Sequence, residues 1–446
     1  MTTKAAFAAA VILMTAAFVS AHPNHAPDAG AAPIEDARRE VLNWTTRAAA
    51  NPGDASVHTR LGQAHLALAR RTTDHADFAR AEAAFRRVLE IEPANFWAPY
   101  GLAYALVGQH RFKEALDSAR VVATHEPTEP EVLALLADIH LSLGNNAEAL
   151  AISRHLAEAN ITPETLARVA LAQHASGDLD GAIATMEDAL EAGRLLESTD
   201  ALMAWVRSML GDFALDAGDL ARARAECEAA LLLDPACHHA QWRLAQLDLR
   251  DAHADSARDR LVALVDKVPK PVYFETLAKA CAATDSPDAM AKATAALDRA
   301  EKAMLAEIDA KGLGHFRELA EFWIEHPAGS ELAARTVELA LRDVTEVRQD
   351  PGAFDTAAWA LYKAGRTSEA LPFARQAVLR NPGSRAFAAR AGIVLLANQD
   401  IIEGRRLLAS ALQRPDALTP ALAEEARKAL EGSDAKAPAA TLPSSR

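Results

Sequence analysis

Two histidines near the start of the chain are the residues whose types and spacing first suggest metal chemistry. His22 and His25 lie in the stretch HPNHAPDAGAAP, which has little to bury, so we expect residues 22–33 to be a flexible lead. A free terminal amine at His22, together with imidazole nitrogens, can chelate Cu(II) or Ni(II), ions that suit nitrogen ligands. The stretch predicts a weak, open metal site at His22 and His25, unless a cleavage site merely happens to precede a histidine.

Three cysteines, Cys227, Cys237 and Cys281, offer a second kind of chemistry. Cys227 and Cys281 fall at positions that the helical pattern turns inward, which favours small buried apolar side chains over reactive thiols. Cys237 begins a new unit and is expected to be more exposed. A Cys227–Cys237 disulfide is possible, but spacing alone does not decide whether it forms.

Sequence patterns of common catalytic sites are absent from the chain. It has no His-Glu-x-x-His, no Gly-x-Ser-x-Gly, no phosphate-binding glycine loop and no Cys-x-x-Cys pair. A repeating helical pattern also occupies about residues 34–430, so no block remains for a separate catalytic domain. We therefore predict a protein without enzyme activity and without a cofactor.

The repeating pattern is clearest in the segment Asp355–Ser384, which reads as one complete helix–turn–helix unit. Its first helix ends at Gly365, and its second begins near Ser368 and stops at Asn381-Pro382-Gly383. Ala370 stands where two antiparallel helices must touch, and only a small side chain there lets the helix axes approach. The unit therefore predicts a closely packed helical hairpin.

A residue equivalent to Ala370 recurs at intervals of mostly about 34 residues, which is the period of a repeat array. The residues assigned to this position are Ala81, Ala115, Ala149, Ala182, Ala223, Ala257, Met290, Ala334, Ala370 and Gly404. The residue seven positions later is apolar in every unit, as the inward stripe of a helix requires.

These features resemble the tetratricopeptide repeat family, whose pattern of W-x2-L-G-x2-Y, A-x3-F and a final Pro extends over about 34 residues. The resemblance implies an all-α fold, a right-handed α-solenoid of about ten helix–turn–helix repeats whose first helices line the concave face. Within the C-terminal block, Arg348-Gln349-Asp350 and the segment Asp355–Arg366 also resemble exported bacterial members of this family that have no assigned activity.

The pattern divides the chain into seven predicted segments. They are a signal peptide (1–21), the flexible lead (22–33), a capping half-repeat (34–52), six regular units (53–269), irregular units with a possible bend (270–350), the C-terminal units (351–430) and a disordered tail (431–446).

The segment 1–21 has the organisation of a secretory signal peptide. Lys4 precedes an apolar run, and Val19-Ser20-Ala21 supplies the small residues of a cleavage site, so we expect cleavage after Ala21 and a periplasmic or secreted protein. An uncleaved N-terminal anchor is the alternative, because the run approaches the length of a membrane span. No later stretch is apolar enough to span a membrane. The net charge of −14 argues against nucleic acid as the main partner.

The resemblance also implies which side chains face the concave groove. Aromatic residues flanked by polar groups suit a protein-binding surface. Besides the residues predicted to bind, the groove positions are Ser208, Leu215, His239, Leu249, Arg250, Asp355 and Lys363. The predicted binding residues are Trp205, Asp212, Asp216, Trp242, Gln246, Trp359 and Tyr362. Each aromatic has the alternative role of a spacer between units.

Together these features predict a non-catalytic periplasmic scaffold that binds a protein or peptide segment in the groove. The carboxylates Asp212 and Asp216 favour a basic or neutral segment, and the absence of a Lys/Asn clamp argues against a C-terminal carboxylate as ligand. The alternatives are a metal-handling protein that uses His22 and His25, and a non-catalytic subunit of a cell-envelope enzyme complex.

Overall fold

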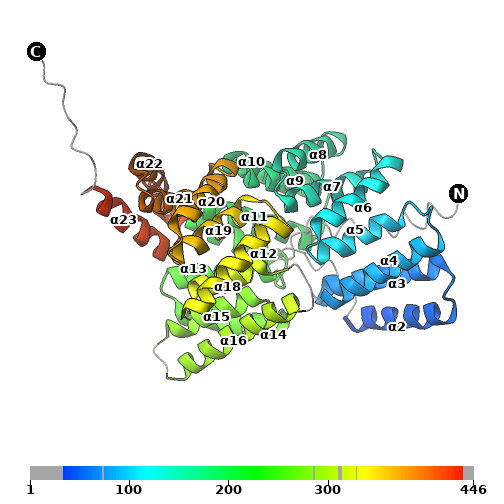
Figure 1. The fold of residues 1–446 in the computed structure, drawn as a ribbon. Helices are drawn as coiled ribbons and strands as arrows, with labels where there is room; N and C mark the ends of the chain where they lie inside the picture. The colour runs from blue at the N-terminus through cyan, green and yellow to red at the C-terminus, as the bar shows by residue number, and fades with distance from the viewer. Residues whose placement is uncertain (1–33, 73–74, 285–286, 310–313, 328, 435–446) are drawn as a thin grey trace, which may run out of the picture.

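The protein is a stack of helices in the computed structural model, which describes residues 34–72, 75–284, 287–309, 314–327 and 329–434 (Figure 1). Within these ranges there is no strand. His22, His25 and the predicted signal peptide lie outside the described residues. No described helix is both long enough and apolar enough to cross a membrane.

Ten helical hairpins follow one another along the described part of the chain. They are α3 (Ala55–Thr72) with α4 (His75–Ile91), α5 (Ala98–Gly108) with α6 (Phe112–His125), α7 (Pro130–Leu143) with α8 (Asn146–Ala159), α9 (Pro163–Ala175) with α10 (Leu179–Leu195), α11 (Asp200–Asp216) with α12 (Leu220–Leu233), α13 (His238–Arg250) with α14 (Ala254–Lys267), α15 (Pro271–Ala282) with α16 (Pro287–Asp309), α17 (Phe316–Glu325) with α18 (Gly329–Arg342), α19 (Pro351–Lys363) with α20 (Thr367–Arg380), and α21 (Arg385–Ala397) with α22 (Ile401–Ala411). This arrangement confirms the predicted α-solenoid of about ten repeats.

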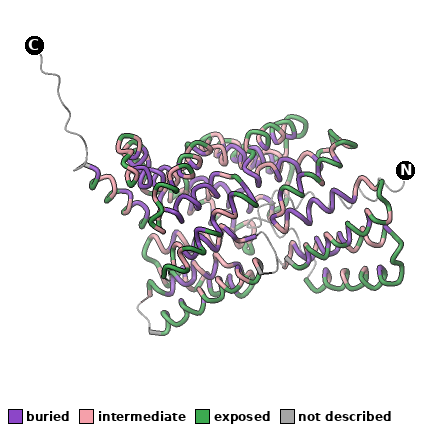
Figure 2. Tube along the Cα trace, viewed as in Figure 1, coloured by how far each residue is buried: buried purple, intermediate pink, exposed green. Residues whose placement is uncertain are grey.

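Single helices cover both ends of the stack. At the start, α2 (Ile34–Ala50) packs on α3 and buries only Ala37 and Ala48, so most of its surface is exposed (Figure 2). At the end, α23 (Pro420–Asp434) packs on α21 and α22 after a short 3₁₀ turn, Pro415–Ala417. Residues 431–434 are helical, and Ser433 is buried. The prediction of a disordered tail is therefore wrong for these four residues.

Small residues at the contact between paired helices explain the tight hairpins. Ala81, Ala115, Ala182, Ala257 and Ala370 are each completely buried, as the repeat predicts. Without side-chain bulk at these positions, the two axes of a pair can approach closely.

Two of the predicted contact positions are wrong by one residue. Met290 is 63% exposed and Ala334 is exposed, whereas Ala289 is buried and the inward stripe of α18 contains Val337 and Ala340. The spacing of Ala370, Ala374 and Ala377 is reproduced by Ala289, Ala293 and Ala296 on α16, all of which are buried. In both units the helical register therefore begins one residue earlier than the sequence interval suggested.

The segment between α15 and α19 departs from regular hairpin geometry. Helix α16 is 23 residues long, longer than the second helix of any other pair, and α18 ends in a π-helix, Asp343–Val347. Arg348 pairs there with Asp343, Nε to Oδ1 at 3.0 Å, and both side chains are buried. Arg317 on α17 reaches Asp350 at 3.2 Å, so ion pairs fix the chain where it enters α19.

The later units pack directly on the earlier ones, so successive turns of the superhelix are in contact with each other. The amide of Gln349 donates to the carbonyl oxygen of Leu143 at 3.1 Å. The side-chain amide of Asn381 donates to the carbonyl oxygen of His174 at 3.1 Å, across 207 residues of sequence. That separation is about six repeats of roughly 34 residues, so one superhelical turn lies against the next.

Candidate functional site: a central cavity

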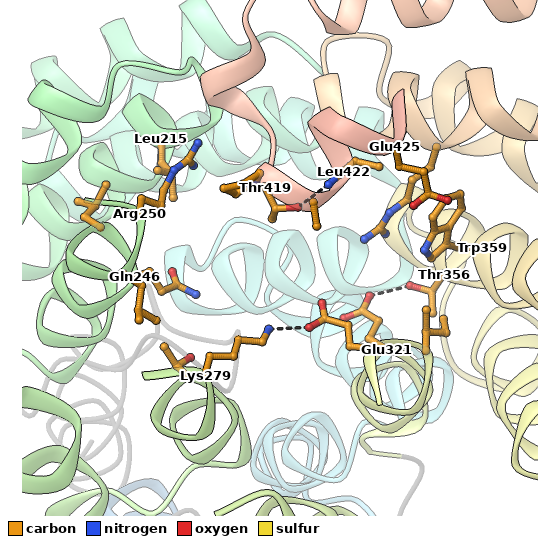
Figure 3. A pocket seen from close by; sticks show the side chains of 18 of the residues that line it. Leu215, Gln246, Arg250, Lys279, Glu321, Thr356, Trp359, Thr419, Leu422 and Glu425 are labelled. Carbon is orange, nitrogen blue, oxygen red and sulfur yellow. Dashed lines mark hydrogen bonds and ion pairs between the residues drawn. The ribbon is translucent and has the colours of Figure 1, made fainter. Parts of the chain in front are cut away.

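Successive first helices enclose a cavity of about 790 Å³ at the centre of the C-terminal part of the solenoid (Figure 3). Its walls come from α11, α13, α15, α17, α19 and α21, and the N-terminal part of α23 covers one side. The lining residues are Leu215, Arg243, Gln246, Leu247, Leu249, Arg250, Thr276, Lys279, Glu321, Ile324, Glu325, Thr356, Trp359, Lys363, Arg390, Thr419, Pro420, Ala421, Leu422 and Glu425. A volume of this size is within the range of ligand-binding pockets.

Sequence reasoning identified part of this cavity. The predicted binding residues Gln246 and Trp359 both line it, and so do Leu215, Arg250 and Lys363 from the wider set of groove positions. These residues come from units that lie far apart in the sequence. They converge because the first helix of each unit turns the same face towards the superhelix axis.

Trp205 does not belong to this surface. Its side chain is 2% exposed and packs in a cluster with Met186 and Met209. The prediction that Trp205 and Trp242 face one open concave surface is therefore wrong, because the indole of Trp205 is buried in the core of the fifth unit.

Trp242 joins two units and does not line the cavity. Its indole nitrogen donates to the hydroxyl of Thr276 on the next first helix at 2.8 Å. The guanidinium of Arg243 lies over its ring, 4.3 Å from the centroid. Of the two roles that the sequence left open for Trp242, these contacts support the spacer between α13 and α15.

The predicted acidic residues of the groove already have partners. Asp212 accepts from Arg243 at 2.6 Å and from the imidazole Nε2 of His239 at 2.9 Å. Although burial opposes ionisation, these two partners hold the pKa of Asp212 well below its usual range. Asp216 lies 2.8 Å from the imidazole of His174, outside the cavity lining. Because both carboxylates already have partners, their positions do not support the expected attraction of a basic segment by Asp212 and Asp216.

Trp359 forms an apolar part of the cavity wall. It is 5% exposed, and the ring of Tyr362 stacks on it with the centroids 5.1 Å apart. Lys363 lies 4.5 Å from the Trp359 centroid and pairs with Glu425 of α23 at 2.7 Å. Tyr362 thus supports the wall from behind, while Trp359 and Lys363 face the cavity.

Basic side chains of the lining are held by fixed partners. Arg390 pairs with the buried carboxylate of Asp355 at 2.6 Å. Arg250 donates to the carbonyl oxygens of Asp416 and Leu418, at 2.9 and 3.0 Å. The first contact joins α21 to α19, and the contacts of Arg250 attach α13 to the segment that leads into α23.

A cluster of Glu275, Glu325 and His326 beside the cavity has the donor types of a metal site. The ammonium group of Lys279 already lies within this cluster, 2.9 Å from Glu275 and 2.5 Å from Glu325. The carboxylates thus have a cation of the protein itself, and we assign the cluster to the ion pairs that join α15 to α17.

The cysteines form no disulfide in the structure. Cys227 and Cys281 are buried as expected, and Cys237 is half-buried. Burial raises the pKa of the Cys227 thiol to about 12, so the thiol stays protonated and unreactive at neutral pH.

Three solved structures show similarity to this chain. TTC0263 of Thermus thermophilus, described as a thermophilic TPR protein, is 22% identical, with 44% of this chain and 100% of that chain covered and a TM-score of 0.37. Yeast Tom70 is 13% identical over 90% of this chain and 93% of its own, with a TM-score of 0.40. YrrB, described as a TPR protein with an unusual peptide-binding site, is 18% identical over 45% and 96%, with a TM-score of 0.31.

Sequence comparison identifies one repeat directly. No curated protein matches the chain. Residues 73–118, however, match the tetratricopeptide repeat family, and they include α4, α5 and the start of α6. The same helical hairpin occurs ten times in the described part of the chain, so the repeat matched at residues 73–118 agrees with the architecture around it.

Proposed function

We propose that this protein is a non-catalytic, exported scaffold that binds a segment of a partner protein in the central cavity. The observation that carries the proposal is the cavity itself, which combines apolar surface from Leu215, Leu249 and Trp359 with charged groups on several helices. Apolar surface supplies binding free energy, and placed polar groups select the ligand. A fold of tetratricopeptide repeats is suited to protein–protein interaction, which agrees with this use.

The proposal is tested by filling the cavity. Gln246→Trp places an indole at the middle of the α13 wall, and we expect it to abolish capture of the partner in a pull-down from cells that express the tagged protein. Leu232→Trp is the matched control, because Leu232 is 87% exposed on the outer helix α12. Equal recovery of the same proteins by both variants would show that binding takes place elsewhere. The melting temperature of each variant shows whether it is folded.

The exported location is part of the same proposal and has its own test. If the signal peptide is cleaved after Ala21, N-terminal sequencing of the protein purified from the periplasm or medium returns His22 as the first residue. Recovery of an intact N-terminus in the membrane fraction would contradict both the location and a terminal-amine metal site at His22 and His25.

A further inference from the structure

Glu321 differs from the other carboxylates that line the cavity. Glu325 pairs with Lys279 at 2.5 Å, and Glu425 pairs with Lys363 at 2.7 Å. Glu321 makes no ion pair with any residue that the structure describes, and its side chain is exposed and lines the cavity. The Thr356 hydroxyl donates a hydrogen bond to its carboxylate at 2.7 Å (Figure 3).

The cations nearest to Glu321 are engaged by other carboxylates. Arg317 is directed to Asp350 at 3.2 Å, and Arg390 to Asp355 at 2.6 Å. Both act on Glu321 only through space, and burial raises its pKa above the ordinary value in spite of them. A carboxylate that faces a cavity without an ion partner can accept a charge-assisted hydrogen bond from a cation that enters the cavity.

The position of Glu321 makes it reachable from inside the cavity. Thr356 fixes one carboxylate oxygen, and Figure 3 shows the side chain reaching from α17 into the space, on the side opposite Arg250. The neighbouring apolar groups Ile324 and Trp359 can pack against the aliphatic part of a long side chain. A lysine or arginine side chain has both the apolar stem and the cationic end that this wall can accommodate.

We propose that Glu321 is the residue by which the cavity selects its ligand, as the acceptor for a lysine or arginine side chain of the bound protein segment. This inference rests on the proposed function and specifies the chemistry of the partner. It assigns the preference for a basic segment to Glu321 and not to the already paired Asp212.

A random peptide library displayed on phage, panned against the full chain, is the probe that tests this assignment. We expect the selected peptides to share a lysine or arginine at one position. Glu321→Gln keeps an acceptor for Thr356 but removes the charge, so it should weaken binding of a selected arginine peptide by roughly tenfold to a hundredfold, the value of a charged hydrogen bond. The same peptide with citrulline in place of arginine should bind the parent and Glu321→Gln equally.

Two controls separate this inference from the proposed function. Glu158→Gln removes an exposed carboxylate on α8, far from the cavity in sequence, and should leave the affinity unchanged. The melting temperature of Glu321→Gln should equal or exceed that of the parent, because the substitution breaks no ion pair, whereas a purely structural carboxylate would lower it.

The outcomes are distinct. Peptides that bind the parent but not Gln246→Trp, and that show no preference for lysine or arginine, would overturn the role of Glu321 and leave cavity binding intact. An arginine peptide that binds the parent and Glu321→Gln equally would do the same. If no selected peptide loses affinity in Gln246→Trp, the proposed function itself fails.

Discussion

The backbone at Gly383 runs directly against the backbone of Gly177, so that a Cβ atom on Gly177 would lie 2.8 Å from the amide nitrogen of Gly383. Gly177 lies in the turn between α9 and α10 with a φ of 88°, and Gly383 belongs to the turn between α20 and α21. The two glycines thus form a contact point between successive superhelical turns, next to the hydrogen bond from Asn381 to His174.

Gly383→Ala should destabilise the protein because the new methyl group overlaps the carbonyl oxygen of Gly177. Backbone on both sides leaves little freedom to adjust, so we expect a loss of about 1–3 kcal/mol, typical of overpacking. Chemical denaturation measures this loss. Gly53→Ala, where a Cβ meets no atom within 4 Å, is the matched control and should not reduce stability.

Ala370→Leu should separate α19 from α20. Ala370 is completely buried at the contact between these helices, and a leucine there has no space without movement of the helix axes. We expect a loss of roughly 1–3 kcal/mol in thermal or chemical unfolding. Leu379→Ala on the outer face of α20, where Leu379 is 72% exposed, should change stability little. An unchanged melting temperature for Ala370→Leu would contradict the helix pairing.

Trp242→Ala should lower stability without changing the affinity of the folded protein for its partner. The substitution removes the hydrogen bond to Thr276 and the ring beneath Arg243, both of which join neighbouring units. Because the indole is only partly buried, we expect a loss of about 3 kcal/mol, the low end for a large-to-small core substitution. Melting temperature and partner affinity measured on the same variant check this; a loss of affinity at unchanged stability would restore Trp242 as a binding residue.

Acid should weaken the junction between α15 and α17. Burial opposes ionisation of Glu275, but His326 and Lys279 lower its pKa to about 2 from the ordinary value of 4.5. A carboxyl group with a lowered pKa in the folded state stabilises the fold above its unfolded pKa, and this contribution is lost as the pH falls from about 4.5 towards about 2. Urea denaturation across this pH range should show that the free energy of unfolding falls less on acidification for Glu275→Gln than for the parent. Glu158→Gln should follow the parent.

The regular part of the fold could be predicted from sequence because each unit repeats one local solution. A small residue at the helix contact, as at Ala370, and a turn at Gly365 are visible without knowledge of any distant contact. Helix α16 is longer than the second helix of the other units, and there the interval of about 34 residues predicts Met290 at the helix contact in place of Ala289. Exposure of the larger side chain explains the difference, since a methionine cannot occupy a close helix contact.

The cavity could be predicted only in part, since groove positions were assigned by analogy between units. Gln246 and Trp359 were found in this way, but Glu321 was not, because α17 lies in the irregular region where the pattern fades. The special feature of Glu321 is its lack of an ion partner, which depends on Arg317 and Arg390 being directed elsewhere. No spacing in the sequence contains that information, although an acid at the groove face of α17 could have drawn attention to it.

The hydrogen bonds between superhelical turns change how this chain should unfold. In an open repeat array each unit contacts only its neighbours, so the array can fray from either end in independent steps. Here Gln349 and Asn381 tie late units to the carbonyl groups of Leu143 and His174, so loss of the late units also removes contacts from α7 and α9. Such long-range ties slow the search for the native state, but they make the molecule a cooperative body that keeps its central cavity in one shape.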